Sequence, residues 1–215
     1  MYYFHCLSDT HGLIQLESAN AEVLAWLHAG DFFDRGNQQI TAEERNGLER
    51  WAGDCRASVF SVQGNHDCGA AKELLDRCTT DITGGLVEIV PTLFVAGVGW
   101  SGGRYYDLPG ERELESVCAS VLHMARRKLF KSDSCILLTH YPAEVPQSCS
   151  EPQFRCLQHL IEILKPLVVI QGHVHSLFGT QWLSASGSLI INPGPTGGTL
   201  FIDLHQRRAR FVASK

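Results

Sequence analysis

The sequence predicts an α/β protein in which two β-sheets pack together with helices on their outer faces. Over the first two-thirds of the 215 residues, short β-branched and aromatic runs alternate with helical patterns, which is typical of parallel strands. The last third holds short strands separated by Gly- and Pro-rich turns, which favours antiparallel pairing. Because no linker-like stretch or fixed-period repeat interrupts the chain, we expect one domain over residues 1–215.

The individual elements follow from local patterns. Apolar, β-branched runs that stop at turn residues predict strands over residues 2–8, 58–62, 86–90, 93–98, 135–139, 167–171, 182–186, 189–192, 199–204 and 209–212. Helical periodicity predicts helices over residues 41–51, 70–78, 111–130 and 152–164. Thr41 and Glu44 have the spacing of a capping box, which marks the start of the first helix. Residues 21–28 fit either a helix or the approach to a short strand that ends before Gly30.

Composition and charge argue against several classes of protein. The formal net charge is −5, which disfavours a general nucleic-acid or membrane-surface binder. No apolar run is long enough to span a bilayer. The first eight residues read as a strand that leads directly into a candidate ligand, Asp9, so a cleavable leader is not expected. The eight cysteines contain no C-x-x-C pair, and we predict reduced thiols and a cytoplasmic location.

Five polar segments stand at the carboxyl ends of expected strands. They cover residues 9–12, 30–36, 64–67, 139–141 and 172–175. In open α/β sheets, functional sites assemble in the crevice beyond the carboxyl ends of the strands. Any one segment alone also fits a turn or a buried histidine, but five together favour a shared site.

The residue types in these segments indicate metal ions. Imidazole and carboxylate together suit Mn, Fe, Zn, Co or Ni, whereas Ca²⁺ prefers oxygen ligands. The candidates are too many for one tetrahedral ion, and a shared carboxylate would hold two ions about 3.5–4 Å apart. Two divalent metal ions are therefore expected, and their identity is left open.

The segments in order read Asp-x-His-Gly, Gly-Asp-x-x-Asp-Arg-Gly, Gly-Asn-His-Asp, a lone His after a strand, and Gly-His-x-His. This set, over residues 9–175, resembles the calcineurin-like metallophosphoesterase family, and the turn at residues 192–194 is similar to one in its small members. The resemblance implies a four-layer α-β-β-α sandwich with two mixed central sheets flanked by helices. It also implies seven metal ligands, which are Asp9, His11, Asp31, Asn65, His140, His173 and His175. Asp9, His11 and His175 would bind the first ion, Asp31 would bridge both ions, and the other three would complete the second site.

The resemblance further implies a catalytic group. His66 is similar to the family's catalytic histidine, Asp34 to the carboxylate that orients it, and Arg35 to the guanidinium that grips a substrate phosphate. A hydroxide bridging the two ions would attack phosphorus in line, and His66 would protonate the departing oxygen. The chain is shorter than the protein phosphatases, which favours a small phosphate-ester substrate.

Other residues have two interpretations. The loop at residues 99–106 contains Trp100 and Arg104, and it fits a pocket wall or an ordinary surface loop equally well. Asp67, Tyr141 and Ser176 adjoin candidate ligands, where they would support those ligands or serve the fold alone.

The predicted function is hydrolysis of phosphomonoesters or phosphodiesters, with small nucleotides among the candidate substrates. Two alternatives stay open. One is a different binuclear metallohydrolase, which the Gly-Asn-His-Asp segment disfavours. The other is a non-catalytic interaction scaffold with the same fold, which the filled ligand positions disfavour. Membrane and nucleic-acid partners are not expected, and a homo-oligomer is left open.

Overall fold

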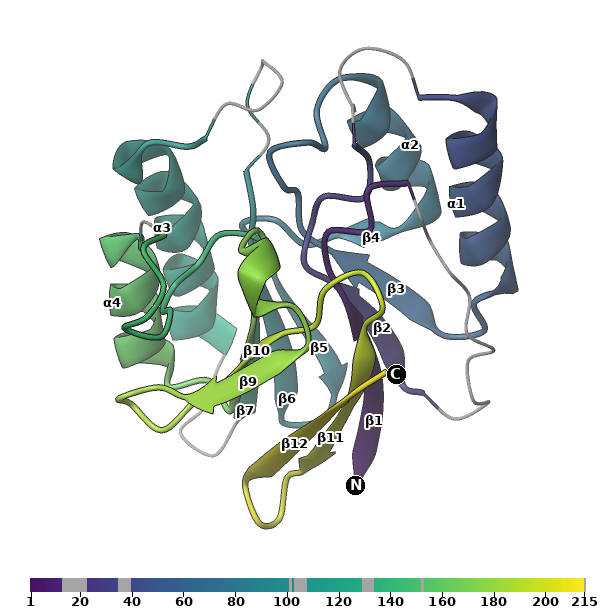
Figure 1. The fold of residues 1–215 in the computed structure, drawn as a ribbon. Coiled ribbons are helices and arrows are strands. Elements are labelled where there is room, and N and C mark those ends of the chain that lie inside the picture. The colour runs from purple at the N-terminus through teal and green to yellow at the C-terminus, as the bar shows by residue number, and fades with distance from the viewer. Residues whose placement is uncertain are drawn as a thin grey trace.

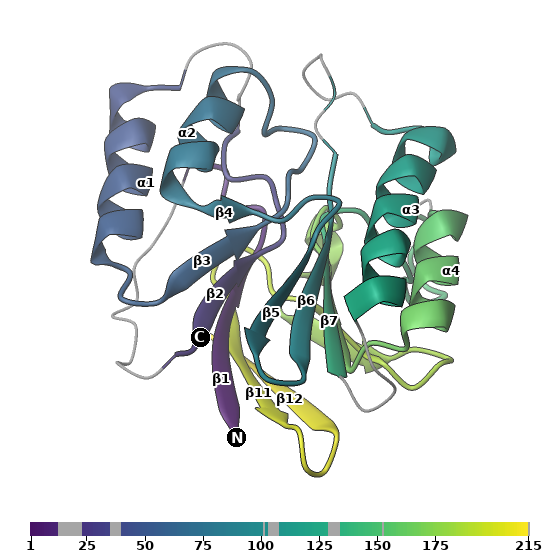
Figure 2. The ribbon, with the colours of Figure 1, turned by 180° about the vertical axis from the view of Figure 1, so that it is seen from behind.

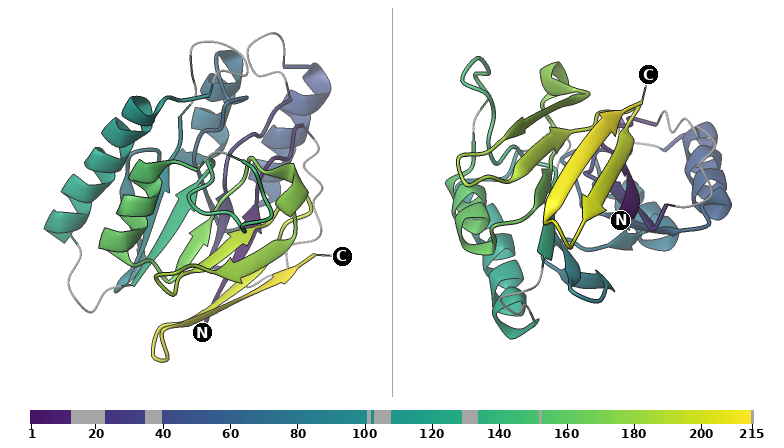
Figure 3. Two further views of the ribbon diagram at one scale, coloured as in Figure 1. Left: turned by 60° about the vertical axis from the view of Figure 1, so that its left-hand side comes forward. Right: turned by 90° about the horizontal axis from the view of Figure 1, so that it is seen from below.

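Two six-stranded sheets form the middle of the molecule, and a pair of helices covers the outer face of each (Figure 1). The computed structural model describes residues 1–12, 23–34, 40–100, 102, 108–128, 134–151 and 153–214. Views from behind and from two further directions show the helix pairs on opposite sides of the sheets (Figures 2 and 3). The predicted four-layer α-β-β-α sandwich is confirmed.

The first sheet has the strand order β12-β11-β1-β2-β3-β4. Its strands are β1 (Tyr2–Leu7), β2 (Ala25–His28), β3 (Ser58–Ser61), β4 (Thr80–Asp81), β11 (Gly198–Asp203) and β12 (Arg208–Ala213). The four strands β1 to β4 are parallel, β11 pairs antiparallel with β1, and β12 pairs antiparallel with β11. Because β1, β2 and β3 are parallel neighbours, the loops that follow them leave from one edge of the sheet.

The second sheet has the strand order β5-β6-β7-β8-β10-β9. Its strands are β5 (Leu86–Val90), β6 (Leu93–Val98), β7 (Ser134–Thr139), β8 (Val168–Ile170), β9 (Thr180–Leu183) and β10 (Leu189–Asn192). The four central strands are parallel, and β5 and β9 pair antiparallel at the two edges. The expected division into early parallel and late antiparallel strands is therefore only partly right, since β5 is early and antiparallel while β10 is late and parallel.

Burial on both faces explains the apolar strand sequences. Every residue of β6 and of β7 is buried, so neither strand shows the alternation of a half-exposed strand. Between the sheets, Phe4 and Leu200 of the first sheet share a core with Ile136 and Ile170 of the second. The sheets thus hold each other through a continuous apolar layer, and this layer fixes how their strand ends face one another.

The helices complete the outer layers. They are α1 (Ala42–Asp54), α2 (Ala70–Cys78), α3 (Glu111–Lys128) and α4 (Arg155–Leu164). On one side, Leu48 and Trp51 of α1 pack with Leu74 of α2 in a buried cluster. On the other side, Leu114 of α3 and Leu160 of α4 pack against the second sheet. Among the helices of the described ranges, none combines the length and the apolar character that a membrane crossing requires.

Some elements differ from the expectation. The strand expected at residues 182–186 is β9, which begins two residues earlier and ends three residues earlier, because Ser184 and Gly187 close a turn through a main-chain hydrogen bond of 3.0 Å. The two-residue strand β4 and the 3₁₀ helix η1 (His175–Leu177) were not predicted. Of residues 21–28, the last four form β2, while residues 21–22 lie outside the described ranges, as do 129–130 and 152 at the ends of two expected helices.

The predicted capping box at the start of α1 is confirmed. The Glu44 amide donates to Thr41 Oγ1 at 3.1 Å, and the Thr41 amide donates to Glu44 Oε2 at 2.8 Å. We expect Thr41→Ala to lower the free energy of unfolding by about 1 kcal/mol, because the Glu44 amide loses its acceptor. Urea denaturation with an unchanged slope would measure this loss. Arg50→Ala, an exposed change on the same helix, is the control, and an equal loss in both variants would contradict the prediction.

Candidate metal centre

The candidate site lies where loops from the two sheets meet. Three of its five segments follow β1, β2 and β3 of the first sheet, and two follow β7 and β8 of the second. The structure brings the seven predicted ligands together in a connected set of short contacts. The members of this set are Asp9, His11, Asp31, Asn65, His140, His173 and His175.

Asp31 is the centre of this set. Its side chain is only 2% exposed, and Oδ2 lies 3.3 Å from His140 Nε2 and 3.8 Å from His66 Nε2. One cluster of potential ligand atoms within 4.8 Å of one another contains Asp31 with His11 and His66, and a second contains it with Asp9 and His140. The Asp31 carboxylate is therefore shared by two clusters, as a bridging ligand has to be.

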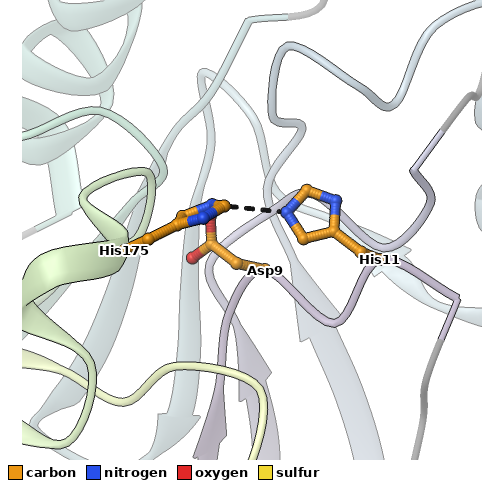
Figure 4. A group of neighbouring side chains, drawn as sticks. All are labelled: Asp9, His11 and His175. Atoms are coloured by element: carbon orange, nitrogen blue, oxygen red, sulfur yellow. Dashed lines mark hydrogen bonds and ion pairs between the residues drawn. The ribbon is translucent and has the colours of Figure 1, made fainter.

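Asp9, His11 and His175 form a third cluster (Figure 4). His175 Nε2 lies 3.6 Å from Asp9 Oδ1 and 3.4 Å from His11 Nε2. The picture shows the two imidazole rings turned toward each other beside the Asp9 carboxylate. Two ring nitrogens this close cannot both carry a proton without repulsion, so at least one presents a lone pair to the space between them.

His140 has a similar arrangement deeper in the site. Its Nδ1 lies 2.8 Å from the Ala29 carbonyl oxygen, which accepts the Nδ1 proton. Nε2 then faces Asn65 Oδ1 at 3.1 Å and His173 Nδ1 at 3.3 Å. A hydrogen bond on one ring nitrogen of a metal-binding histidine orients the other nitrogen toward the ion, so His140 is held as a ligand would be.

The charges in the site depend on each other. Burial alone would lower the pKa of His140, but the carboxylates of Asp31 and Asp9 raise it to about 9. Burial alone would raise the pKa of Asp31, but His140 and His66 hold it below its usual range. Burial and the charge on His140 lower the pKa of His173 to about 4. The buried carboxylates thus require a positive charge among the histidines, which either a proton or a metal ion supplies.

His66 lies at the edge of this set. Its Nδ1 is 2.8 Å from the main-chain carbonyl oxygen of Asp34, and its main-chain amide donates to Asp31 Oδ1 at 2.9 Å. The Asp34 carboxylate lies 3.9 Å from His11 Nδ1. The hydrogen bond from His66 Nδ1 thus reaches the main chain of Asp34, and the predicted orienting role of the Asp34 carboxylate stays a prediction. Arg35 lies outside the described residues.

Asp67 supports the central carboxylate. It is fully buried and accepts main-chain hydrogen bonds from Asp31 at 2.8 Å, Phe32 at 2.9 Å and Gly64 at 3.0 Å. Burial and the neighbouring Asp31 charge raise the pKa of Asp67 to about 7. Gly64 has to be glycine, since a Cβ there would overlap Asp31 Oδ1.

The backbone is strained at the same places. Of the seven non-glycine residues with positive φ in the described ranges, four are candidate ligands: Asp9 (51°), His11 (44°), Asp31 (57°) and His173 (67°). The left-handed conformation costs a side-chain-bearing residue about 1–2 kcal/mol, and it persists where surrounding contacts hold it. Strain concentrated in this way is typical of functional sites.

Other predicted residues are placed only in part. The Tyr141 hydroxyl donates to the Trp100 carbonyl oxygen at 2.6 Å, which ties the start of the 99–106 loop to the end of β7. Arg104 lies outside the described residues, so the predicted pocket wall stays a prediction. Ser176 lies in η1, between His175 and Leu177.

Sequence reasoning missed one supporting pair. Thr10 stands between two candidate ligands, and its hydroxyl lies 3.1 Å from His28 Nε2. The His28 ring stacks on Phe32, with centroids 3.5 Å apart. His28 ends β2 three residues before Asp31, and a polar residue at the end of an otherwise apolar strand was the available signal.

The donor set fits divalent transition-metal ions. It combines imidazole nitrogens, carboxylate oxygens and one amide oxygen, which lie close to one another. Together with the α-β-β-α architecture, it defines the chain as an α/β sandwich with a candidate metal centre at the strand ends.

Comparison with known proteins identifies the family. A family model described as calcineurin-like phosphoesterase matches residues 3–177, so the chain belongs to the calcineurin-like phosphoesterase family. The predicted family is confirmed, and the match includes all seven candidate ligands. No curated protein sequence matches the chain significantly.

Solved structures share the fold. The protein TT1561 of Thermus thermophilus is similar with a TM-score of 0.68 and 16% identity, over 99% of this chain and 98% of that one. The phosphopantetheinyl hydrolase PptH from Mycobacterium tuberculosis has a TM-score of 0.57 and 13% identity, over 99% of this chain and 96% of that one. At these identities the likeness concerns the fold alone.

Replacing Asp67 tests the support for Asp31. Asp67→Asn turns one acceptor oxygen into a donor that faces main-chain N–H groups, so we expect metal affinity to fall about 10–100-fold. Calorimetric titration of metal-free protein with Mn²⁺ would measure the change. Asp76→Asn, the same substitution in a surface ion pair with Lys72, is the control. Equal affinities in the two variants would show that Asp67 does not support the site.

Proposed function

We propose that the chain is a phosphoesterase that uses two divalent metal ions to hydrolyse phosphomonoesters or phosphodiesters of small molecules, with nucleotides among the candidates. The observation that carries the proposal is the position of Asp31, whose buried carboxylate belongs to two clusters of potential ligands. Seven convergent donors exceed what one tetrahedral ion takes. A carboxylate between two groups of histidines is the arrangement that a two-metal site uses.

The exposure of the side chains indicates where a substrate approaches. Asp31 and His140 are 2% and 0% exposed, so the sheet side of the site is closed. His175 is 60% exposed, and His11 is 20% exposed. A phosphate ester would therefore enter on the side where His175, His11 and the edge of His66 meet the solvent.

The protein side chains and the bound ions would have different roles in the reaction. When bound, the divalent ions would neutralise charge on the phosphoryl oxygens and activate a water molecule. His66 would supply the proton that the departing oxygen needs. The Asp34 carbonyl oxygen accepts from His66 Nδ1, which leaves Nε2 on the side that faces Asp31. His66 would act as the general acid from this position.

Membership of the calcineurin-like phosphoesterase family supports a hydrolase. One fold neighbour is itself described as a phosphopantetheinyl hydrolase, so the fold that this chain shares with it is one that a hydrolase uses. The net charge of −5 favours a small-molecule substrate over a nucleic acid. We also propose a cytoplasmic location for the reaction.

The first test is a substrate panel. Protein reconstituted with Mn, Fe, Zn, Co or Ni is assayed against aryl phosphates, aryl phosphodiesters and cyclic nucleotides. We expect metal-dependent hydrolysis, and we expect Asp31→Asn to reduce it by about 10²–10³-fold, because the shared carboxylate loses its charge. Absence of hydrolysis with every metal and every substrate would reject the proposed function.

The second test concerns His66. His66→Ala should retain the metal content of the wild type but reduce turnover by about 10²–10⁴-fold for esters with poor leaving groups. Activated aryl esters should lose much less, because their leaving oxygen departs without a proton. His159→Ala removes an exposed histidine of α4 and is the control. Equal losses for both kinds of ester would defeat the general-acid assignment.

A further inference from the structure

The segment that carries His173 and His175 is held by a residue that follows it in the chain. Asn192 ends β10 and is fully buried. Its side-chain Nδ2 donates to the Gly172 carbonyl oxygen at 3.4 Å and to the Val174 carbonyl oxygen at 3.1 Å. Its own main-chain carbonyl oxygen accepts from the Gly179 amide at 2.8 Å. One residue thus contacts the start, the middle and the end of the segment 172–179.

The orientation of the Asn192 amide follows from its neighbours. With the group reversed, Oδ1 would face two carbonyl oxygens, which cannot donate. As oriented, Oδ1 is buried and has no hydrogen-bond partner in the described part of the chain. A buried acceptor without a partner costs free energy, so Oδ1 does not stabilise the structure. The stabilising contacts of the side-chain amide are the two hydrogen bonds that Nδ2 donates.

The two carbonyl groups that Asn192 contacts flank a strained residue. His173 lies between them and has a φ of 67°, in the left-handed region. On its other side, the His173 amide donates to both oxygens of Asp9, at 3.0 and 3.1 Å. The strained turn is therefore held between Asp9 and Asn192, and this holds His173 Nδ1 3.3 Å from His140 Nε2.

The residues after Asn192 reach the opposite side of the site. The Ser8 amide donates to the Gly194 carbonyl oxygen at 3.1 Å, and the Gly194 amide donates to Ser8 Oγ at 3.2 Å. Ser8 precedes Asp9, so the turn at residues 192–194 links the loop after β8 in the second sheet to the loop after β1 in the first. This link joins the same two loops that the hydrogen bonds from the His173 amide to Asp9 connect directly.

We propose that Asn192 is a positioning residue of the metal centre, which acts by holding His173 and His175 in place through its side-chain amide. The proposal rests on the proposed function in one respect, since it takes these two histidines as metal ligands. Asn192 itself would not touch the ions or the substrate. The family match ends at residue 177, so Asn192 lies outside it.

Asn192→Asp is the decisive variant, because it keeps the shape of the side chain but turns the donor toward the two carbonyl groups into an acceptor. In metal-free protein, we expect amide hydrogen exchange over residues 172–179 to rise at least about tenfold over wild type, while exchange in β6 changes much less. Mn²⁺ affinity should fall about 10–100-fold, as for other residues that orient ligands. Asn192→Ser removes the same donors without a charge and keeps the test decisive should the Asp variant not fold.

Ile191→Val is the matched control, since it weakens the buried core one residue away on the same strand and leaves the amide intact. A purely structural role for Asn192 predicts the same exchange pattern and Mn²⁺ affinity in this control as in the Asn192 variants, and that result would overturn the proposal. If wild-type protein binds Mn²⁺ but hydrolyses no ester, the proposed function fails, while the exchange and affinity measurements still decide the role of Asn192.

Discussion

The buried negative charge of Asp31 is the constraint on which the rest of the site depends. A carboxylate removed from water is costly unless opposite charge or hydrogen-bond donors surround it. Here the His66 amide and the His140 ring lie against it, at 2.9 and 3.3 Å. The histidines also face one another, so burial and the charge on His140 lower the pKa of His173 and disfavour a second proton nearby. A site built in this way favours bound cations, and the family to which the chain belongs uses that property.

The fold brings the buried carboxylates and the strained backbone together at one edge of the sheets. Parallel strands send their following loops to one edge, and packing the two sheets together brings two such edges face to face. The price is backbone strain at four of the candidate ligands, Asp9, His11, Asp31 and His173. Hydrogen bonds to main-chain groups stabilise the strained conformations. Asp67 accepts one from the amide of Asp31, and Asn192 donates one to the carbonyl oxygen of Val174, next to His173. The rigid sheets position the loops, and the loops carry the chemistry.

Much of the local structure was predictable, because it depends on local patterns. The helix α2 and the strands β5, β6 and β10 have the predicted bounds, since each follows a local pattern ended by turn residues. Pairing partners were not predictable. β11 lies beside β1 although nearly the whole chain separates them, and the two residues of β4 pair with the end of β3. The bounds of β9 differ from the predicted ones because the end of this strand depends on hydrogen bonds within the turn that follows it.

The candidate ligands were predictable from the sequence, whereas the residues that position them were not. The candidate ligands lie in short polar segments that follow strands, and the family resemblance that these segments carry names them. A support such as Asn192 acts on main-chain carbonyl groups, which every residue has, and no spacing rule reveals which ones it will reach. The contact between His66 Nδ1 and Asp34 shows the same limit, because it reaches a main-chain oxygen that no sequence pattern marks. Positions that hold a site through the main chain are therefore found from coordinates, and mutations there should alter metal binding without removing any ligand.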